Sequence, residues 1–325
     1  MKALPADLAL VCRRMRAETG VALAVHEKPD TDALGAAAGM LDLFAQLGAE
    51  ARLYVSPAEK LPLESYLLPA GAVERGMPAP GLPLYALDCG AQPRLALERT
   101  SGFPFLVDID HHHDNTRYGD LVYVRGDASS TSEMVCDIAR ALGLAPSAPA
   151  ATALYAGISF DSGHFRHAST SAHTFATAAW LAESGVDVTA VYRELYEQRS
   201  SASLRLWAHA VLAAQAVAEG RGLVAQLLLS DYEAAGAHED ETEGIVESLR
   251  AVDGVEVAAL VKEQSDGRRV RVSLRSSGLD VSAVAARQGG GGHRMAAGFS
   301  SDDDPGEVTA WLSSELARRL RTASS

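Results

Sequence analysis

Short apolar runs alternate with helical patterns in the first half of the chain. Apolar runs of strand length occupy residues 21–26, 51–55, 84–88 and 105–110. Apolar side chains recur at helical spacing over residues 33–47, 131–142, 149–159 and 171–183. Thr131 or Ser132 can cap the second of these helices, and Gly143 ends it. Strands that alternate with helices predict an α/β fold with a parallel, doubly wound sheet.

The second half of the chain has a different pattern. Residues 188–218 are continuously helical and rich in charge, and Gly220 and Gly222 follow them. Strand patterns then occupy residues 223–229, 255–261 and 268–274, with helical patterns at 241–251 and 307–319. We therefore predict an α/β domain over residues 1–187, a helical linker over 188–220, and a smaller α+β domain over 221–325.

Length and composition agree with this division. A chain of 325 residues, 47% of them hydrophobic, exceeds one typical core and is globular. It contains no run of eighteen apolar residues, and its first segment lacks the apolar centre of a signal peptide. Cys12, Cys89 and Cys136 are odd in number and widely spaced, which argues against a disulfide scaffold. We expect a cytoplasmic protein that binds no membrane.

The charge balance limits the class of partner. The net charge of −13 at pH 7 disfavours a surface that binds duplex nucleic acid. A small phosphorylated substrate is still compatible with this charge, because metal ions and a few arginines can reverse the sign inside one cleft.

Acidic and imidazole side chains follow four apolar segments of the first domain. These groups lie within residues 26–32, 87–90, 107–115 and 158–163. Ligands of open α/β sheets bind beyond the carboxyl ends of the strands, so three of these loops should meet at one rim. Carboxylates and imidazoles suit manganese, iron or magnesium, and two neighbouring ions need about six protein ligands. The pattern therefore predicts a two-metal site.

Each segment alone also has an ordinary explanation. An Asp-x-Asp after a strand is often a turn or a helix cap. Asp88 fits a turn at the end of a strand, Asp161 fits the end of a helix, and His113 and Asp114 fit an exposed loop. Four such segments, in this order on one predicted fold, favour the metal site.

The spacing of these residues resembles that of the DHH phosphoesterase superfamily, whose signature is Asp110-His111-His112 here. The segment HEKPDTDALGAAAGM from His26 is similar to the family motif H-x-x-P-D-x-D-A-x-G-S, with Ala36 in place of serine. The segment 289–299, GGGGHRMAAGF, resembles the GGGH signature of the DHH-associated C-terminal domain. The nearest branch is the NrnA-type group of oligoribonucleases and 3′-phosphoadenosine-5′-phosphate (pAp) phosphatases, which also holds cyclic-di-AMP and pApA phosphodiesterases.

The resemblance implies two divalent metal ions as cofactors, with manganese first and magnesium or iron as alternatives. One ion would be bound by His26, Asp30 and Asp88, and the other by Asp32, Asp88, His111 and Asp161. Asp88 would therefore bind both ions. The implied catalytic residues are Asp88, His112, which would face the scissile phosphate, and Asp110, which would orient the neighbouring imidazoles.

The resemblance also implies substrate contacts in both domains. In the first domain, Asn115 and Arg117 would contact phosphate or sugar. In the second domain, the arginines at 268, 269 and 271 fit a solvated strand face, whereas Arg275 and Ser276 stand where similar proteins bind the end of the substrate. Glycine backbone N–H groups can approach an anion closely. The predicted contacts of this loop are Gly290, Gly291, Gly292 and His293.

The implied function is hydrolysis of short 5′-phosphorylated oligoribonucleotides to nucleoside 5′-monophosphates, of pAp to AMP and phosphate, or of both. A cyclic-di-AMP phosphodiesterase of the same family is the main alternative, and a homodimer is left open. A family-II inorganic pyrophosphatase is disfavoured by the GGGGH segment. A RecJ-like exonuclease is disfavoured by the lack of a basic groove. A nucleotide-binding module without activity is disfavoured because all six metal ligands are present.

Overall fold

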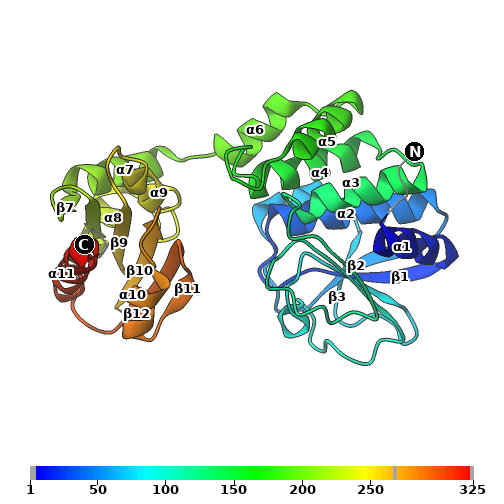
Figure 1. Ribbon diagram of the computed structural model, residues 1–325, viewed down its shortest axis with the longest axis horizontal. Coiled ribbons are helices and arrows are strands. Elements are labelled where there is room, and N and C mark those ends of the chain that lie inside the picture. Colours follow the sequence, from blue (N-terminus) through cyan, green and yellow to red (C-terminus); the bar gives the residue numbers. More distant parts are fainter. Residues whose placement is uncertain (1–4, 266–268, 323–325) are drawn as a thin grey trace. The chain divides into compact units, whose positions relative to one another are not determined.

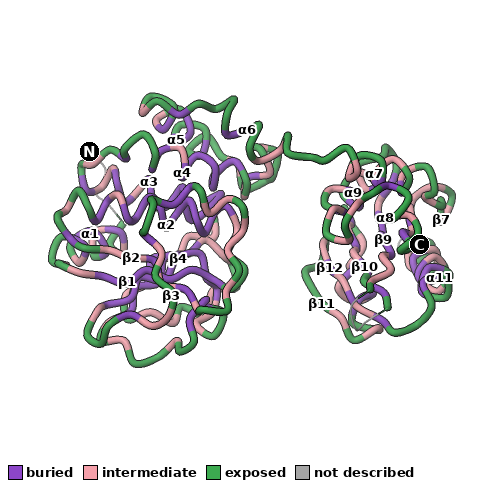
Figure 2. Tube along the Cα trace, turned by 180° about the vertical axis from the view of Figure 1, so that it is seen from behind, coloured by how far each residue is buried: buried purple, intermediate pink, exposed green. Residues whose placement is uncertain are grey.

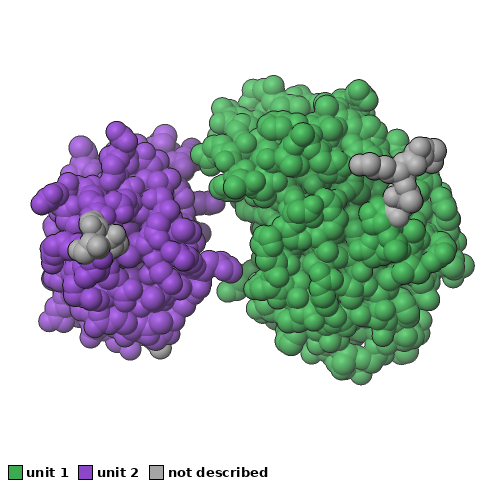
Figure 3. Space-filling view, viewed as in Figure 1, with its two compact units in different colours: residues 1–197 green, residues 198–325 purple. Residues whose placement is uncertain are grey.

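The computed structural model describes residues 5–265 and 269–322 (Figure 1). The chain forms two compact units, residues 1–197 and 198–325, which are coloured separately in Figure 3. Within the described part of the chain, no helix is both long and apolar enough to cross a lipid bilayer.

The first unit is built on a six-stranded sheet in which every strand pair is parallel. The strand order is β3-β2-β1-β4-β5-β6. The strands are β1 Gly20–Ala24, β2 Glu50–Val55, β3 Val73–Arg75, β4 Leu84–Leu87, β5 Leu106–Asp110 and β6 Leu121–Val124. The helices are α1 Ala6–Ala17, α2 Thr31–Gln46, α3 Thr131–Leu142, α4 Ala148–Asp161, α5 Ala172–Glu183 and α6 Val188–Tyr196. The predicted parallel α/β sheet is confirmed.

Alternation along the strands separates two apolar clusters. In β5, Val107 and Ile109 belong to the large core between the sheet and the helices of the first unit. Figure 2 shows the buried residues of this unit in purple. Leu106 belongs to a second cluster, formed by strand residues and the segments that connect the strands. Asp108 and Asp110 share the face of Leu106 and are fully buried. Two buried carboxylates therefore lie on the face that the connecting segments cover.

Helices α2 and α4 approach each other closely because glycines line their contact. A Cβ atom at Gly35 would lie 2.5 Å from the carbonyl oxygen of Ala153. A Cβ atom at Gly157 would lie 2.2 Å from the Ser132 Oγ and 2.8 Å from the Asp32 Oδ1. All three distances are shorter than the contacts that real Cβ atoms make. Because Gly35 and Gly157 have no side chain, α4 can lie this close to α2 and to Asp32.

The second unit contains a mixed six-stranded sheet of order β11-β12-β10-β9-β8-β7. Only β8 and β9 pair in parallel among its described strands. The strands are β7 Gln215–Val217, β8 Gly222–Leu227, β9 Val257–Glu263, β10 Val270–Ser276, β11 Gly291–His293 and β12 Ala296–Ser301. The helices are α7 Ser201–Ala213, α8 Leu229–Ala235, α9 Ile245–Arg250, α10 Ser282–Ala285 and α11 Pro305–Thr322. Helices α10 and α11 pack on one face, and α7, α8 and α9 pack on the other.

Several predicted boundaries were wrong for local reasons. The continuous helix expected over 188–218 is two helices followed by strand β7. The second helix begins separately because Ser200 caps α7 by accepting a hydrogen bond from the Ser203 N–H. The strand expected over 223–229 ends at Leu227, since Asp231 accepts from the Leu228 N–H and α8 begins. Helix α3 is capped by Ser130, whose Oγ accepts from the Glu133 N–H, and not by the next two residues.

The glycine-rich loop was also predicted incorrectly in part. Gly291–His293 form strand β11, which pairs with β12 in antiparallel register. The strand expected over 268–274 runs over Val270–Ser276, and Arg268 lies outside the described residues.

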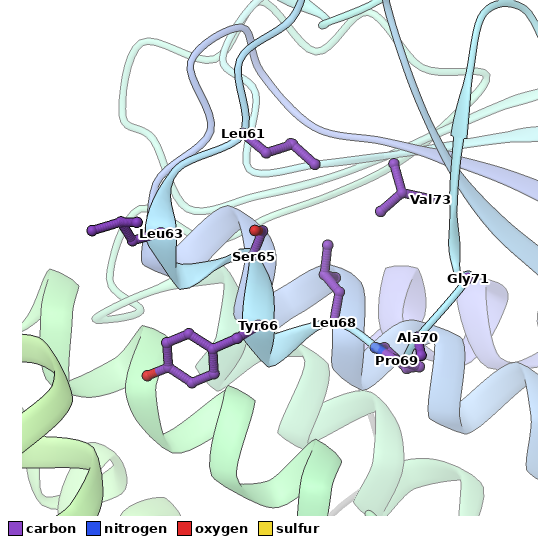
Figure 4. A pocket seen from close by; sticks show the side chains of 9 residues that line it. All are labelled: Leu61, Leu63, Ser65, Tyr66, Leu68, Pro69, Ala70, Gly71 and Val73. Carbon is purple, nitrogen blue, oxygen red and sulfur yellow. The ribbon is translucent and has the colours of Figure 1, made fainter.

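A hollow of about 540 Å³ lies beside the 3-10 turn η1, Leu63–Leu67 (Figure 4). Apolar side chains make up most of its wall, and it contains none of the predicted metal ligands. Its lining residues are Leu61, Leu63, Ser65, Tyr66, Leu68, Pro69, Ala70, Gly71 and Val73.

The second unit should lose stability in acid through Glu315. The carboxylate is 5% exposed and lies within 3.0 Å of guanidinium nitrogens of Arg287, Arg318 and Arg319. The hydrogen bond with Arg318 lowers the pKa of Glu315, and burial opposes this effect. Together with the hydrogen bonds of the other two arginines, it brings the pKa from 4.5 to about 2. A lowered pKa stabilises the fold above the unfolded value, and this stabilisation is lost as pH falls from about 4.5 towards 2.

We expect Glu315→Gln to lower the free energy of unfolding at pH 7 by about 1–2 kcal/mol, allowing for water around the exposed arginines. The difference from the unmodified protein should shrink as pH falls through this range. Thermal or urea unfolding of both proteins between pH 7 and pH 2.5 measures it. A difference that stays constant over this range would contradict the assignment.

Candidate metal centre

The predicted ligands meet at the carboxyl ends of three adjacent strands. His26 follows β1, Asp88 follows β4, and His111 follows β5, and these strands are neighbours in the sheet. Asp30 caps α2 and Asp32 stands in its first turn, while Asp161 ends α4. The parallel sheet thus gathers residues from four segments of the chain at one rim.

The donor atoms form three overlapping groups, each within 4.8 Å. His26, Asp30 and Asp88 make the first group, and Asp32, His111 and Asp161 make the second. Asp88 also joins His111 and His112 in the third group. The structure therefore brings all six predicted ligands together. The first group equals the first expected set. The second group lacks only Asp88, which lies next to it because its Oδ1 is close to the His111 Nε2.

Asp88 has the geometry of a shared ligand. Its carboxylate is 2% exposed, and its backbone has a φ of +56°, a region that favours glycine, asparagine and aspartate. The Oδ2 atom lies 3.6 Å from the His26 Nε2, and the Oδ1 atom lies 3.6 Å from the His111 Nε2. The unusual backbone conformation thus presents one oxygen to each side of the site.

Helix α3 supports two of the carboxylates, and the sequence did not predict this role. The N–H groups of Thr131 and Ser132 donate to the two carboxylate oxygens of Asp32 at 2.7 and 2.9 Å. The Thr131 hydroxyl donates to the Asp88 Oδ1 at 2.9 Å. The positive end of the helix therefore faces the fully buried Asp32. The run of serine and threonine from residue 129 to 132 was the available signal, but it predicted only a cap.

The electrostatics of the site fit divalent cations. Burial, with the charges of Asp88 and Asp161, raises the pKa of Asp32 well above its usual range. Burial alone would lower the pKa of His26, yet its hydrogen bonds with Asp30 and Asp88 raise it to about 10. Burial would also lower the pKa of His111, but its hydrogen bond with Asp161 and the nearby carboxylate charges raise it to about 10. Without metal ions, protons on these residues therefore balance the charge of the carboxylates. Divalent cations at the same place would neutralise the carboxylates instead.

The donor chemistry agrees with this conclusion. Carboxylate oxygens and imidazole nitrogens suit manganese, magnesium or iron, and the three cysteines take no part in the donor groups. Cys89, next to Asp88, is buried, which raises the pKa of its thiol to about 11. The site can therefore hold metal ions through carboxylates and imidazoles, without a thiolate ligand.

A chain of hydrogen bonds orients His112. Its Nδ1 donates to the Asp110 Oδ1 at 2.7 Å, and the Asn115 amide donates to the Asp110 Oδ2 at 2.6 Å. The same amide donates to the Asp108 Oδ1 at 3.1 Å. Asp108 is fully buried, and among the described residues its Oδ2 has no hydrogen-bond partner. Burial raises the pKa of Asp108 to about 7. The contact of this carboxylate with Asn115 was not predicted from the sequence.

The loop residues after this chain differ in exposure. The Asn115 Oδ1 accepts from the Arg117 N–H at 2.5 Å, so both polar groups of Asn115 are engaged within the protein. Arg117 is exposed, as are His113 and Asp114. The contacts of Asn115 and Arg117 with substrate stay predictions, and Asn115 has a supporting role in addition.

The predicted contacts of the second unit divide between two faces of its sheet. His293 pairs with Ala296, and Ala296 pairs with Arg275, so these residues form one row on one face. Ser276 is buried on the other face, where its hydroxyl donates to the Glu256 carbonyl. The Ser276 side chain therefore points away from Arg275, and its contact with substrate stays a prediction.

Arg275 and the glycine segment are positioned more favourably. The Arg275 Nε lies 2.8 Å from the Glu247 Oε1, which holds the guanidinium group in place. Gly291 and Gly292 are exposed, and a Cβ atom at Gly291 would meet nothing within 4 Å. Gly290 instead packs against β12, since a Cβ atom there would lie 2.3 Å from the Gly298 carbonyl oxygen.

Comparison with known proteins agrees with this arrangement. Residues 20–158 match the model of the DHH family, N-terminal domain, and residues 219–320 match that of the DHHA1 domain. A protein of Streptococcus mutans named as a probable bifunctional oligoribonuclease and PAP phosphatase NrnA is 32% identical, over 90% of this chain and 92% of its own. The bifunctional oligoribonuclease and PAP phosphatase NrnA of Thermus thermophilus is 35% identical, over 89% and 86%.

A solved structure shows the same fold. An exopolyphosphatase-related protein from Bacteroides fragilis superposes with a TM-score of 0.87 at 20% sequence identity, covering 99% of each chain.

Proposed function

The chain belongs to the DHH family of phosphoesterases, and we propose on this premise that it hydrolyses short 5′-phosphorylated oligoribonucleotides and pAp. The observation that carries the proposal is the position of Asp88, whose two carboxylate oxygens face different imidazoles inside a group of six acidic and imidazole ligands. The names of the two relatives supply the substrate class. The products would be nucleoside 5′-monophosphates from oligonucleotides, and AMP with phosphate from pAp.

The metal centre would hold two divalent ions, with manganese as the first choice. His26, Asp30 and Asp88 would bind one, and Asp32, Asp88, His111 and Asp161 the other. When bound, such ions lower the pKa of a water molecule and neutralise charge on phosphoryl oxygens.

The protein's own groups would bind and orient the phosphate. The hydrogen bond with Asp110 raises the pKa of His112, which keeps its ring protonated to higher pH. The Nδ1–H is used by Asp110, so the Nε2–H of the 38% exposed side chain is free to donate to a phosphoryl oxygen. Asn115 would hold Asp110 in this orientation. In the second unit, Arg275 and His293 would bind the far end of the substrate.

A substrate panel tests the proposal. Initial rates are measured with manganese and with magnesium on 5′-phosphorylated oligoribonucleotides from dimers to long oligomers, on pAp, on cyclic-di-AMP and on pyrophosphate. We expect the highest rates with dimers and pAp in manganese, and inhibition when a chelator removes the metal. Faster hydrolysis of cyclic-di-AMP or of pyrophosphate would replace the proposed substrate, and no hydrolysis of any of them would overturn the proposal.

A further inference from the structure

The segment after Asp161 makes a left-handed turn. Gly163, His164 and Phe165 have φ angles of +57°, +59° and +61°, which glycine adopts readily and other residues adopt at a cost in free energy. The turn is fixed to the end of α4, because the His164 N–H donates to the Ser159 carbonyl at 2.7 Å. Strained backbone that the surroundings hold in place is found at functional sites more than elsewhere.

The turn displays the His164 ring beside two tyrosines of α6. The ring centroid of His164 lies 4.9 Å from that of Tyr192 and 5.4 Å from that of Tyr196. The Tyr196 hydroxyl donates to the Ser159 carbonyl at 3.0 Å, which anchors the group to α4. His164 is exposed, and Tyr192 is 38% exposed. We call His164, Tyr192 and Tyr196 the aromatic shelf.

Packing of α6 does not account for the exposed rings. The helix lies against α4 (Figure 1), and its buried side chain is Val191, at 4% exposure. The outer sides of His164 and Tyr192 remain in water and bury little apolar area. Packing on α4 does not require the His164 ring, since alanine or glycine at position 164 would leave Val191 buried in the same place. The strained backbone at His164 therefore has no explanation in packing.

The shelf is joined to the metal centre by a short stretch of chain. His164 is three residues after Asp161, whose Oδ2 lies 3.0 Å from the His111 Nε2. Arg166 is exposed in the same turn, and its Nε donates to the Gly163 carbonyl at 2.7 Å. An aromatic surface and a cation therefore lie within one turn of chain from a predicted metal ligand.

We propose that the aromatic shelf binds the nucleobase of the nucleotide that carries the scissile phosphate, an inference that rests on the proposed function. Bases stack on tyrosine and histidine rings without regard to sequence, because every base offers a π face. A base is joined to its phosphate through one ribose, so a shelf one turn from the metal ligands suits it. Arg166 adds positive charge beside the phosphate in an otherwise acidic chain.

The test compares two substrates that differ only in their bases. The Michaelis constants of pApA and of a 5′-phosphorylated abasic dinucleotide are measured for the unmodified protein, His164→Gly, Tyr192→Leu and the control Phe175→Leu. Phe175 is 57% exposed and stacks on Phe165, so the control changes an exposed ring outside the shelf. We expect both shelf variants to raise KM for pApA about 5- to 100-fold, with kcat and the abasic KM little changed. The control should leave the ratio of the two constants unchanged.

Two further readouts separate stacking from a structural role. A dinucleotide with 2-aminopurine in place of adenine should lose fluorescence when it binds the unmodified protein with calcium present, and lose little with either shelf variant. His164→Gly should keep or raise the melting temperature, because glycine relieves the positive φ. The inference would be overturned if the shelf variants kept the KM ratio and the fluorescence quenching of the unmodified protein. It would also be overturned if they had a lower melting temperature and lost activity equally on both substrates. If the unmodified protein hydrolyses neither substrate, the proposed function fails, and the quenching alone decides on the shelf.

Discussion

Asp88→Asn is expected to lower the rate of hydrolysis of pApA and pAp at least about a thousand-fold while the fold stays intact. Asparagine has almost the shape of aspartate and tolerates the positive φ at this position. The substitution therefore removes the charge that faces His26 and His111 without adding backbone strain. Because both proposed ions share this carboxylate, its loss weakens two sites at once.

The matched control for this variant is Asp114→Asn. Asp114 is an exposed carboxylate in the loop that follows the DHH residues, and it belongs to none of the donor groups. Its substitution should leave the rate within about two-fold, since an exposed charge contributes little. Initial rates with manganese, the number of bound ions by calorimetry and circular dichroism are compared for the three proteins. Near-full activity of Asp88→Asn would refute the shared-ligand assignment.

Gly157→Ala is expected to destabilise the first unit and to weaken metal binding, although alanine favours helices. Alanine in place of glycine within a helix stabilises by about 1 kcal/mol when nothing else changes. At Gly157, the new Cβ atom would stand 2.2 Å from the Ser132 Oγ and 2.8 Å from the Asp32 Oδ1. Relief of such overpacking costs about 1–3 kcal/mol, so the net effect is a loss of stability. The Asp32 carboxylate must also shift from its position in the donor group with His111 and Asp161.

Gly278→Ala serves as the control for the Gly157 variant. Gly278 is exposed, and a Cβ atom there would meet nothing within 4 Å. Melting temperatures and manganese titrations of both variants measure the effect. If Gly157→Ala were more stable than the unmodified protein, with unchanged affinity for manganese, the close approach of α2 and α4 would not control Asp32.

The meeting of acidic and imidazole groups at one rim could be predicted from the sequence, because four apolar segments lie beside such groups and a parallel sheet brings strand ends together. The assignment of six of these groups as metal ligands came from the resemblance to the DHH superfamily and stays a prediction. These residues are His26, Asp30, Asp32, Asp88, His111 and Asp161.

Other features depend on geometry that spacing does not encode. The N–H groups of Thr131 and Ser132 bond to Asp32, about one hundred residues away, only once α3 lies against α2. The side of the sheet on which Ser276 lies depends on where β10 begins, and a shift of one residue reverses it. The amide of Asn115 reaches two carboxylates only because the loop folds back over β5.

The bonds between Asp32 and helix α3 have a consequence for the order of events during synthesis. A chain grown to residue 130 already carries five of the six metal ligands, yet it lacks the two N–H groups that hold Asp32, 99 and 100 residues further on than the carboxylate. Closing so long a loop is entropically unfavourable until the strands between are paired. We therefore expect the nascent chain to acquire its metal ions only after α4 has emerged, when the sheet beneath them is already complete.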